Sequence, residues 1–121
     1  MNEKATLRNQ CDRLWKEICF KKYGTRCEIC GESFRTTPHH FYYRGSIPWL
    51  RYEILNGIIL CQKCHALLHF KDPKIIEEKI IKIRGKKWLN KLNKIKDDKP
   101  KFFKTDLEWY EKKLDILKKL K

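Results

Sequence analysis

The chain has 121 residues, a length that fits one small domain with a short appendage, and its 29 Lys and Arg against 15 Asp and Glu give a formal net charge of +14. No apolar run is long enough to span a membrane, and the polar start MNEKATLRNQ lacks the apolar centre of a signal peptide. We therefore expect an intracellular, cytoplasmic protein with no membrane partner. The excess of positive charge predicts a polyanionic partner, most simply nucleic acid.

The first predicted element is an amphipathic helix over residues 5–22. Its apolar residues recur at the three-four spacing of a helix with one buried face. Cys11 and Cys19 lie on that face, so we assign them to the core rather than to a metal site. Gly24 is a natural residue to end this helix.

Residues 26–73 have a different character, with short apolar runs, turn residues and all four histidines of the chain. The segment FRTTPHHFYY is rich in aromatic and β-branched residues, which favours a strand or hairpin arm, and GIILC reads as a second, short strand. Between them, RGSIPWLRYEILN reads as a loop. QKCHALLHF reads as a helix that ends before Pro73.

The remainder of the chain is predicted to be helical and charged. PKIIEEKIIKI begins with Pro73 at a helix start, Gly85 interrupts it, and KKWLNKLNKIK follows. DDKPKFFK reads as a linker, and the last helix begins with Thr105 and Glu108 in capping-box spacing. We divide the chain into a core over 1–72 and a basic helical extension over 73–121, which either packs on the core or contacts the DNA backbone through its Lys faces.

Two cysteine pairs predict a structural zinc site. Cys27 and Cys30 are separated by two residues, as are Cys61 and Cys64, and a gap of that length lets one tight turn present two sulfurs to a tetrahedral ion. In a reducing compartment such pairs are more typical of metal sites than of disulfides. We reject a two-cysteine, two-histidine finger made of Cys27, Cys30, His65 and His69. It would leave Cys61 and Cys64 without a role, and the 34 residues between Cys30 and His65 are too many for that motif, which has about 12.

The histidines are left without a role in that zinc site. His65 and His69 are four residues apart on a predicted helix, so their rings project from one face. His39 and His40 are neighbours on a predicted strand, where adjacent side chains point to opposite faces. This arrangement indicates two distinct roles for the pair, such as metal ligand and proton acceptor.

The combined order Cys-x2-Cys, His-His, Asn, Cys-x2-Cys-His-x3-His resembles the HNH endonucleases, and in particular the small phage-type enzymes. The similarity covers roughly residues 24–72 and implies an α+β fold, in which a small ββα-metal, treble-clef-like core is braced by zinc between an N-terminal helix and a C-terminal helical extension. It implies a metal-dependent DNA endonuclease in which His40 is the general base, Asn56 holds the hairpin, and His39, His65 and His69 bind one catalytic ion.

The chemistry of phosphodiester hydrolysis agrees with this reading. An imidazole can accept a proton near neutral pH, and three protein ligands leave positions open on a divalent ion for phosphate and water. We expect the ion to be Mn²⁺, Ni²⁺, Zn²⁺ or Mg²⁺, and three imidazoles favour Mn²⁺ or a similar transition ion over Mg²⁺. Arg44 and Arg51 are expected to contact phosphate, although Arg51 is equally well explained as a structural brace.

Two other functions are compatible with parts of the sequence. A non-catalytic zinc-knuckle module that binds nucleic acid explains the cysteines and the charge, but it leaves the histidines and Asn56 as coincidences. A protein-interaction adaptor explains the helical extension alone. The nuclease is therefore the leading hypothesis, with the zinc-knuckle module as the alternative.

Overall fold

A computed structural model describes residues 2–121 except for the side chain of Phe70. Residue 1, where the predicted region 1–72 begins, lies outside the described residues. The fold is α+β, with helices in the majority and one small sheet, as the sequence predicts. The elements in chain order are α1 (Glu3–Tyr23), β1 (Thr36–His40), two 3₁₀ turns (Pro48–Leu50 and Ile54–Asn56), β2 (Gly57–Cys61), α2 (Gln62–Ala66), a π-helical turn (Leu67–Lys71), α3 (Pro73–Arg84), α4 (Lys86–Asp97) and α5 (Leu107–Leu120).

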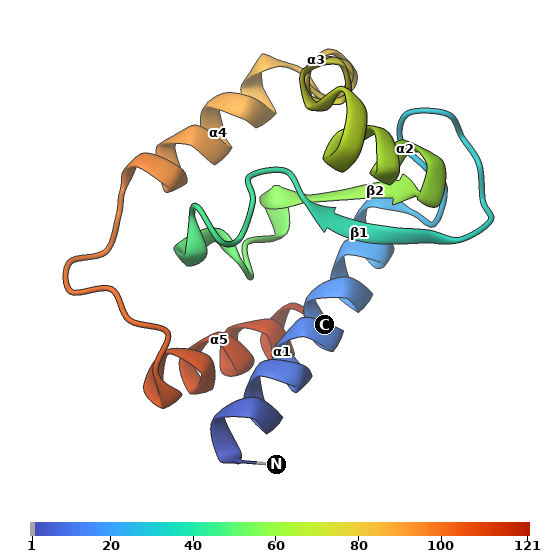
Figure 1. The fold of residues 1–121 in the computed structure, drawn as a ribbon. Coiled ribbons are helices and arrows are strands. Elements are labelled where there is room, and N and C mark those ends of the chain that lie inside the picture. The colour runs from blue at the N-terminus through green and yellow to red at the C-terminus, as the bar shows by residue number, and fades with distance from the viewer. Residues whose placement is uncertain (1) are drawn as a thin grey trace.

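The two strands form an antiparallel hairpin at the centre of the molecule. Thr36 pairs with Cys61 at one end and His40 pairs with Gly57 at the other, so the hairpin joins the cysteine and histidine segments. In Figure 1 the hairpin lies between α3 and α4 on one side and the neighbouring helices α1 and α5 on the other. The strand β1 is shorter than the ten-residue arm FRTTPHHFYY that the sequence predicts.

The strand β2 supplies side chains to two separate hydrophobic clusters. All five of its residues are buried, and successive side chains of a strand point to opposite faces. Ile58 and Leu60 therefore belong to the cluster that includes α3 and α4, whereas Ile59 belongs to the cluster of α1 and α5. From the C-terminal extension the first cluster contains Ile76, Ile80, Trp88 and Leu92, and the second contains Tyr110, Leu114 and Leu117.

Helix α1 extends the predicted span 5–22 by a short distance at each end. The Asn2 side chain accepts a hydrogen bond from the Ala5 amide at the start, and Gly24 adopts φ 88° at the end, a conformation that favours glycine. Cys11 and Cys19 are fully buried on the packed face, which confirms their assignment to the core. Burial raises the pKa of Cys11 to about 11 and that of Cys19 to about 12, so both thiols stay protonated.

Two predicted helix features are wrong. The cap of α5 is Asp106 rather than Thr105, because the Asp106 side chain, one position closer to the helix, accepts the hydrogen bond from the Trp109 amide. The segment QKCHALLHF does not form one regular α-helix, since α2 gives way at Leu67 to a π-helical turn. None of the helices in the described part of the chain is both long and apolar enough to cross a membrane.

Candidate metal centre and histidine pocket

The four paired cysteines converge at the end of the hairpin. Cys27 and Cys30 lie in the turn that follows α1, where Gly31 closes the turn with φ 78° and donates its amide to the Cys27 carbonyl at 2.9 Å. Cys61 ends β2, and Cys64 follows in the first turn of α2. All four sulfurs lie within 4.8 Å of one another, as the spacing of the two pairs predicts.

The sulfur geometry fits a zinc ion. Four sulfurs about 2.3 Å from zinc at tetrahedral angles lie about 3.8 Å from one another. The Cys30 and Cys61 sulfurs are 3.6 Å apart, so an ion of this size can be accommodated with little movement. Burial alone raises the pKa of the Cys27 thiol, but hydrogen bonds from backbone amides lower it overall to about 7, whereas burial raises the pKa of Cys64. Of these two thiols, Cys27 is therefore the one that more readily gives the thiolate that a metal requires.

A four-thiolate site would be closed. Four protein ligands complete the coordination shell of zinc and leave no position for substrate or water, which is the pattern of a structural site. Across residues 2–121, the Phe70 side chain aside, these cysteines are the only group of at least three His, Cys, Asp or Glu side chains with all its ligand atoms this close together. The knuckle, meaning the two cysteine turns around residues 27–30 and 61–64, could therefore hold a metal but offers no site for chemistry.

All four histidines meet elsewhere, in a cavity of about 330 Å³. His39 and His40 come from β1, His65 comes from α2, and His69 comes from the π-helical turn. The cavity, here called the histidine pocket, is also lined by Lys16, Thr37, Pro38, Tyr43 and Arg44. The structure thus brings together five of the residues that the sequence singled out.

Three of the histidines contact one another through their rings. His39 stacks on His65 with ring centroids 3.7 Å apart, and His65 meets His69 edge to face at 4.4 Å. The Nε2 atom of His39 is buried without a hydrogen-bond partner, a costly state that a bound ion would relieve. Because the rings of His39 and His65 lie nearly parallel, 13° apart, their in-plane lone pairs do not converge on one point, and a shared ion requires a rotation of at least one ring.

The protonation state of these rings suits metal binding. Burial lowers the pKa of His39 to about 3, and the neighbouring charges of His65 and His69 act in the same direction. Burial and His69 also lower the pKa of His65. At neutral pH His39 is therefore an uncharged imidazole, the form that binds metal ions.

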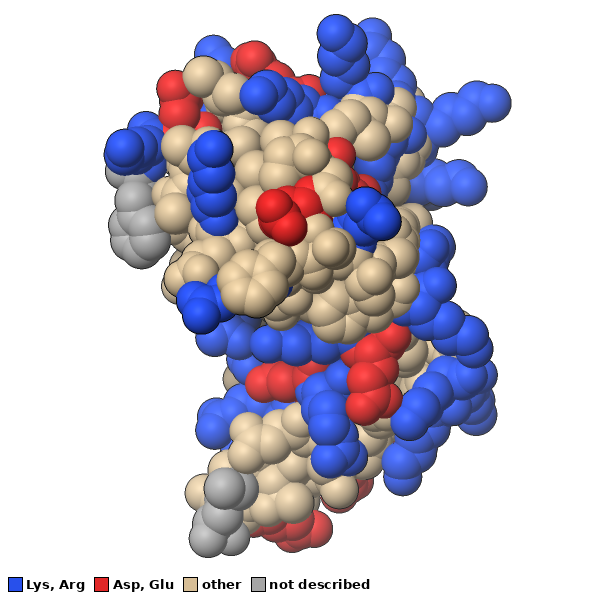
Figure 2. Space-filling model, turned by 90° about the vertical axis from the view of Figure 1, so that its right-hand side faces the viewer, with Lys and Arg blue, Asp and Glu red and all other residues tan. Residues whose placement is uncertain are grey.

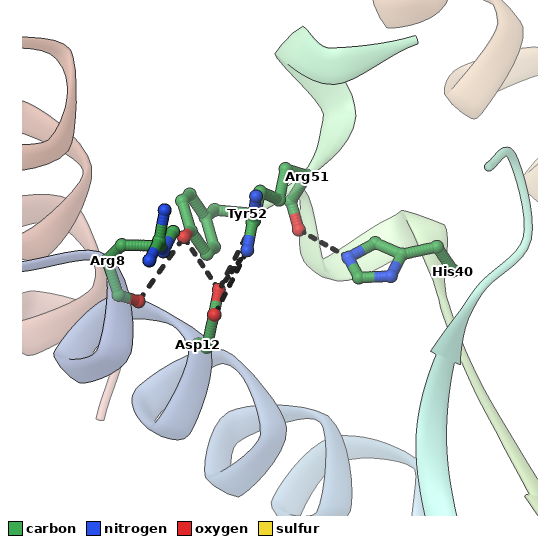
Figure 3. Close-up of polar contacts among 5 residues, drawn as sticks. All are labelled: Arg8, Asp12, His40, Arg51 and Tyr52. Atoms are coloured by element: carbon green, nitrogen blue, oxygen red, sulfur yellow. Dashed lines mark hydrogen bonds and ion pairs between the residues drawn. The ribbon is translucent and has the colours of Figure 1, made fainter. Parts of the chain in front are cut away.

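His40 is held in one tautomer by the backbone. Its Nε2 atom lies 2.8 Å from the carbonyl oxygen of Arg51, and because a carbonyl can only accept, the ring must donate from Nε2 (Figure 3). In the neutral ring Nδ1 is then unprotonated and able to take a proton. Burial lowers the pKa of His40 to about 4, a shift that the bond to the Arg51 carbonyl opposes, so the ring is neutral at pH 7.

Asn56 fastens together the two ends of the loop that connects β1 to β2. Its side chain is fully buried; Oδ1 accepts from the Tyr42 amide at 2.8 Å, and Nδ2 donates to the Tyr42 carbonyl at 3.1 Å and the Leu50 carbonyl at 3.5 Å. The Asn56 carbonyl also accepts from the amide of Phe41, directly after His40. Asn56 thus fixes the backbone on the C-terminal side of both β1 histidines.

The two arginines that were expected to contact phosphate have different surroundings. Arg44 is exposed and lines the histidine pocket, where a phosphate could reach it. Arg51 forms an ion pair with Asp12, and its side chain is only 17% exposed. The structure therefore shows Arg51 acting as a structural brace, the second of its two explanations. A contact between Arg51 and phosphate stays a prediction.

Helix α1 contributes residues that the sequence analysis did not identify as part of the site. Lys16 lines the pocket, and Trp15 stacks flat on the His40 ring with centroids 4.2 Å apart and planes 3° from parallel. Asp12 holds Arg51 from the same helix. No spacing pattern links these residues to the histidines, because their proximity arises only from the packing of α1 against the hairpin.

Comparison with known proteins identifies no relative. No protein-family model matches the chain, and no curated protein or solved structure matches it significantly. Any function must therefore be argued from the two clusters themselves.

Proposed function

We propose that this protein is a metal-dependent endonuclease of the HNH type that hydrolyses DNA phosphodiester bonds. The observation that carries the proposal is the histidine pocket, in which one histidine held as a neutral base lies beside three that contact one another. A binding module has no need to bury uncharged histidines in a cavity rimmed by Lys16 and Arg44. The zinc knuckle then serves to anchor the hairpin that carries the histidines.

His40 would act as the general base. A water molecule in line with the scissile bond must lose a proton as it attacks phosphorus, and a neutral imidazole accepts that proton at neutral pH. The hydrogen bond from Nε2 to the Arg51 carbonyl leaves Nδ1 for this task and stabilises the charge that develops on the ring. In this role one ring nitrogen takes the proton, while the hydrogen bond made by the other nitrogen fixes the orientation of the ring.

His39, His65 and His69 would hold the catalytic ion. A divalent ion bound there supplies Lewis-acid stabilisation to the phosphate and the leaving oxygen. The orphaned Nε2 of His39 supports this ligand role, and a ring rotation that breaks the stack with His65 would accompany binding. An all-imidazole ligand set favours Mn²⁺ or Ni²⁺ over Mg²⁺.

The surface charge would bring DNA to the pocket. Lys and Arg side chains cover much of the face shown in Figure 2, and Asp and Glu form smaller groups among them. Lys16 and Arg44 also place positive charge among the residues that line the pocket. Contacts of this kind attract the phosphate backbone without reading base sequence.

A metal-dependence assay tests the proposal. Purified protein carrying its structural zinc is incubated with supercoiled plasmid in EDTA, and then with Mn²⁺, Ni²⁺, Zn²⁺ or Mg²⁺ in excess of the chelator. We expect nicked or linear DNA with Mn²⁺ at a rate about tenfold or more above that with Mg²⁺, and no cleavage in EDTA. DNA binding without cleavage under every ion would overturn the proposal in favour of the zinc-knuckle binding module.

A further inference from the structure

The carbonyl that holds His40 belongs to a peptide unit that is itself clamped from helix α1. The Arg51 carbonyl and the Tyr52 amide share one peptide plane, so the side chains of these two residues flank the group that accepts from His40. Both side chains reach the same carboxylate, that of Asp12 (Figure 3). The orientation of that plane is therefore set from outside the loop.

The clamp consists of several short contacts to one residue. Arg51 donates from Nε to Asp12 Oδ1 at 3.2 Å and from Nη2 to Oδ1 and Oδ2 at 3.1 and 3.0 Å. The Tyr52 hydroxyl donates to Asp12 Oδ1 at 2.7 Å and lies 3.5 Å from the Arg8 carbonyl. Bidentate and charge-assisted contacts of this kind restrict geometry more than a single hydrogen bond does.

The same helix contacts the histidine ring directly. Trp15 lies one turn after Asp12, so both side chains project from one face of α1. Its indole stacks on His40 and donates from Nε1 to the Glu53 carbonyl at 3.0 Å. Residues 51–53 and the base are thus held against one helical turn.

We infer that Asp12 is a positioning residue for the base: it fixes the Arg51–Tyr52 peptide plane and thereby holds His40 as the Nε2–H tautomer, while Trp15 sets the plane of the ring. The inference rests on the proposed nuclease function for its catalytic consequence but not for its structural content. Asp12 is not among the residues that line the pocket, and the hydrogen bonds that connect it to His40 run through Arg51 and its carbonyl.

Histidine tautomers can be measured directly by long-range ¹H–¹⁵N NMR on the zinc-loaded protein without added catalytic metal. We expect the wild-type His40 to show Nε2 protonated and Nδ1 bare. In Asp12→Asn, which keeps the shape but loses the charge, the ring should populate both tautomers. With Mn²⁺ and plasmid, kcat should fall about tenfold or more while KM stays within about twofold, as expected for a residue that orients a reacting group without touching the substrate.

The control is Glu17→Gln, on the same helix and with the same change in charge. Glu17 pairs with Lys121 at the surface, away from the pocket, so this variant should match the wild type in tautomer and rate. If Asp12→Asn fails to fold, Tyr52→Phe removes one contact of the clamp with little change in shape and is measured in the same way.

The outcomes separate the two proposals. A wild-type ring protonated at Nδ1, or a folded clamp variant with unchanged tautomer and kcat, overturns the positioning role of Asp12. If no plasmid is cut by the wild type but the tautomer responds to Asp12→Asn, the positioning role stands and the nuclease function fails.

Discussion

The knuckle and the histidine pocket hold their side chains in place by different means. Each cysteine pair is positioned by its own tight turn, so the four sulfurs lie within 4.8 Å of one another once β2 brings the turns together. The histidines depend on distant contacts, because His40 is held by the carbonyl of Arg51 and by Trp15 from α1. A site built from local turns is little affected by substitutions elsewhere in the chain. A site built from long-range packing can be altered by substitutions at residues that do not line it.

Removing a knuckle ligand should have the largest effect. Cys61→Ser takes one thiolate from the cluster, and because the free energy of zinc binding is part of the folding free energy of such sites, we expect loss of cooperative unfolding and of bound zinc. Circular dichroism melting and metal analysis measure both. The matched control is Cys11→Ala, a buried cysteine outside the cluster, which should keep its zinc and lose only about 1 kcal/mol of stability.

The knuckle also has one long-range support, and breaking it should cost less. The Glu28 carboxylate accepts from Arg84 at 2.7 and 2.8 Å and from the Ile59 amide at 2.7 Å, and both charged side chains are nearly buried. Glu28→Gln leaves the Arg84 charge without its partner, and we expect a loss of about 3 kcal/mol in denaturant unfolding.

The exposed pair of Glu108 and Lys112 provides the comparison for that measurement. Glu108→Gln should change the unfolding free energy by no more than about 0.5 kcal/mol. Equal losses in the two variants would mean that the Glu28 pair does not support the knuckle.

Removing the Asn56 side chain should lower the stability of the fold without changing the amount of zinc bound at the knuckle. Asn56→Ala leaves the amide and carbonyl of Tyr42 without their buried partners, at a cost of about 2–3 kcal/mol, and should also displace His40 and slow cleavage. Bound zinc should stay at the wild-type level. Full activity in a destabilised Asn56→Ala protein would show that the pocket does not depend on this support.

The smallest effect is expected at the rim of the pocket. Arg44→Gln should weaken DNA binding and reduce the slope of log affinity against log salt by about 1, the value for one lost phosphate contact. Fluorescence anisotropy at several salt concentrations measures this slope. Arg13→Gln, an exposed position on α1 outside the pocket lining, is the control, and an equal loss there would point to general charge rather than to the rim.

The same contrast explains how far the sequence could predict the structure. The cysteine cluster, the end of α1 at Gly24 and the strand over 57–61 follow from local spacing and were predicted correctly. The clamp of Asp12 on Arg51 joins positions 39 residues apart, and no local pattern encodes it. The sequence also left the extension free to pack or to bind DNA, and Trp88, Leu92, Tyr110 and Leu114 show that its apolar faces are used for packing.

The measurement that tests the central claim most directly is plasmid cleavage by His40→Ala beside the wild type. Both proteins are incubated with supercoiled plasmid and Mn²⁺, with DNA binding, zinc content and melting temperature determined on the same samples. We predict that the wild type cuts, and that His40→Ala keeps its zinc and its DNA affinity but loses at least about 100-fold in cleavage rate. Cleavage by a folded His40→Ala protein at the wild-type rate would contradict the assignment of the base and, with it, the function proposed for the pocket.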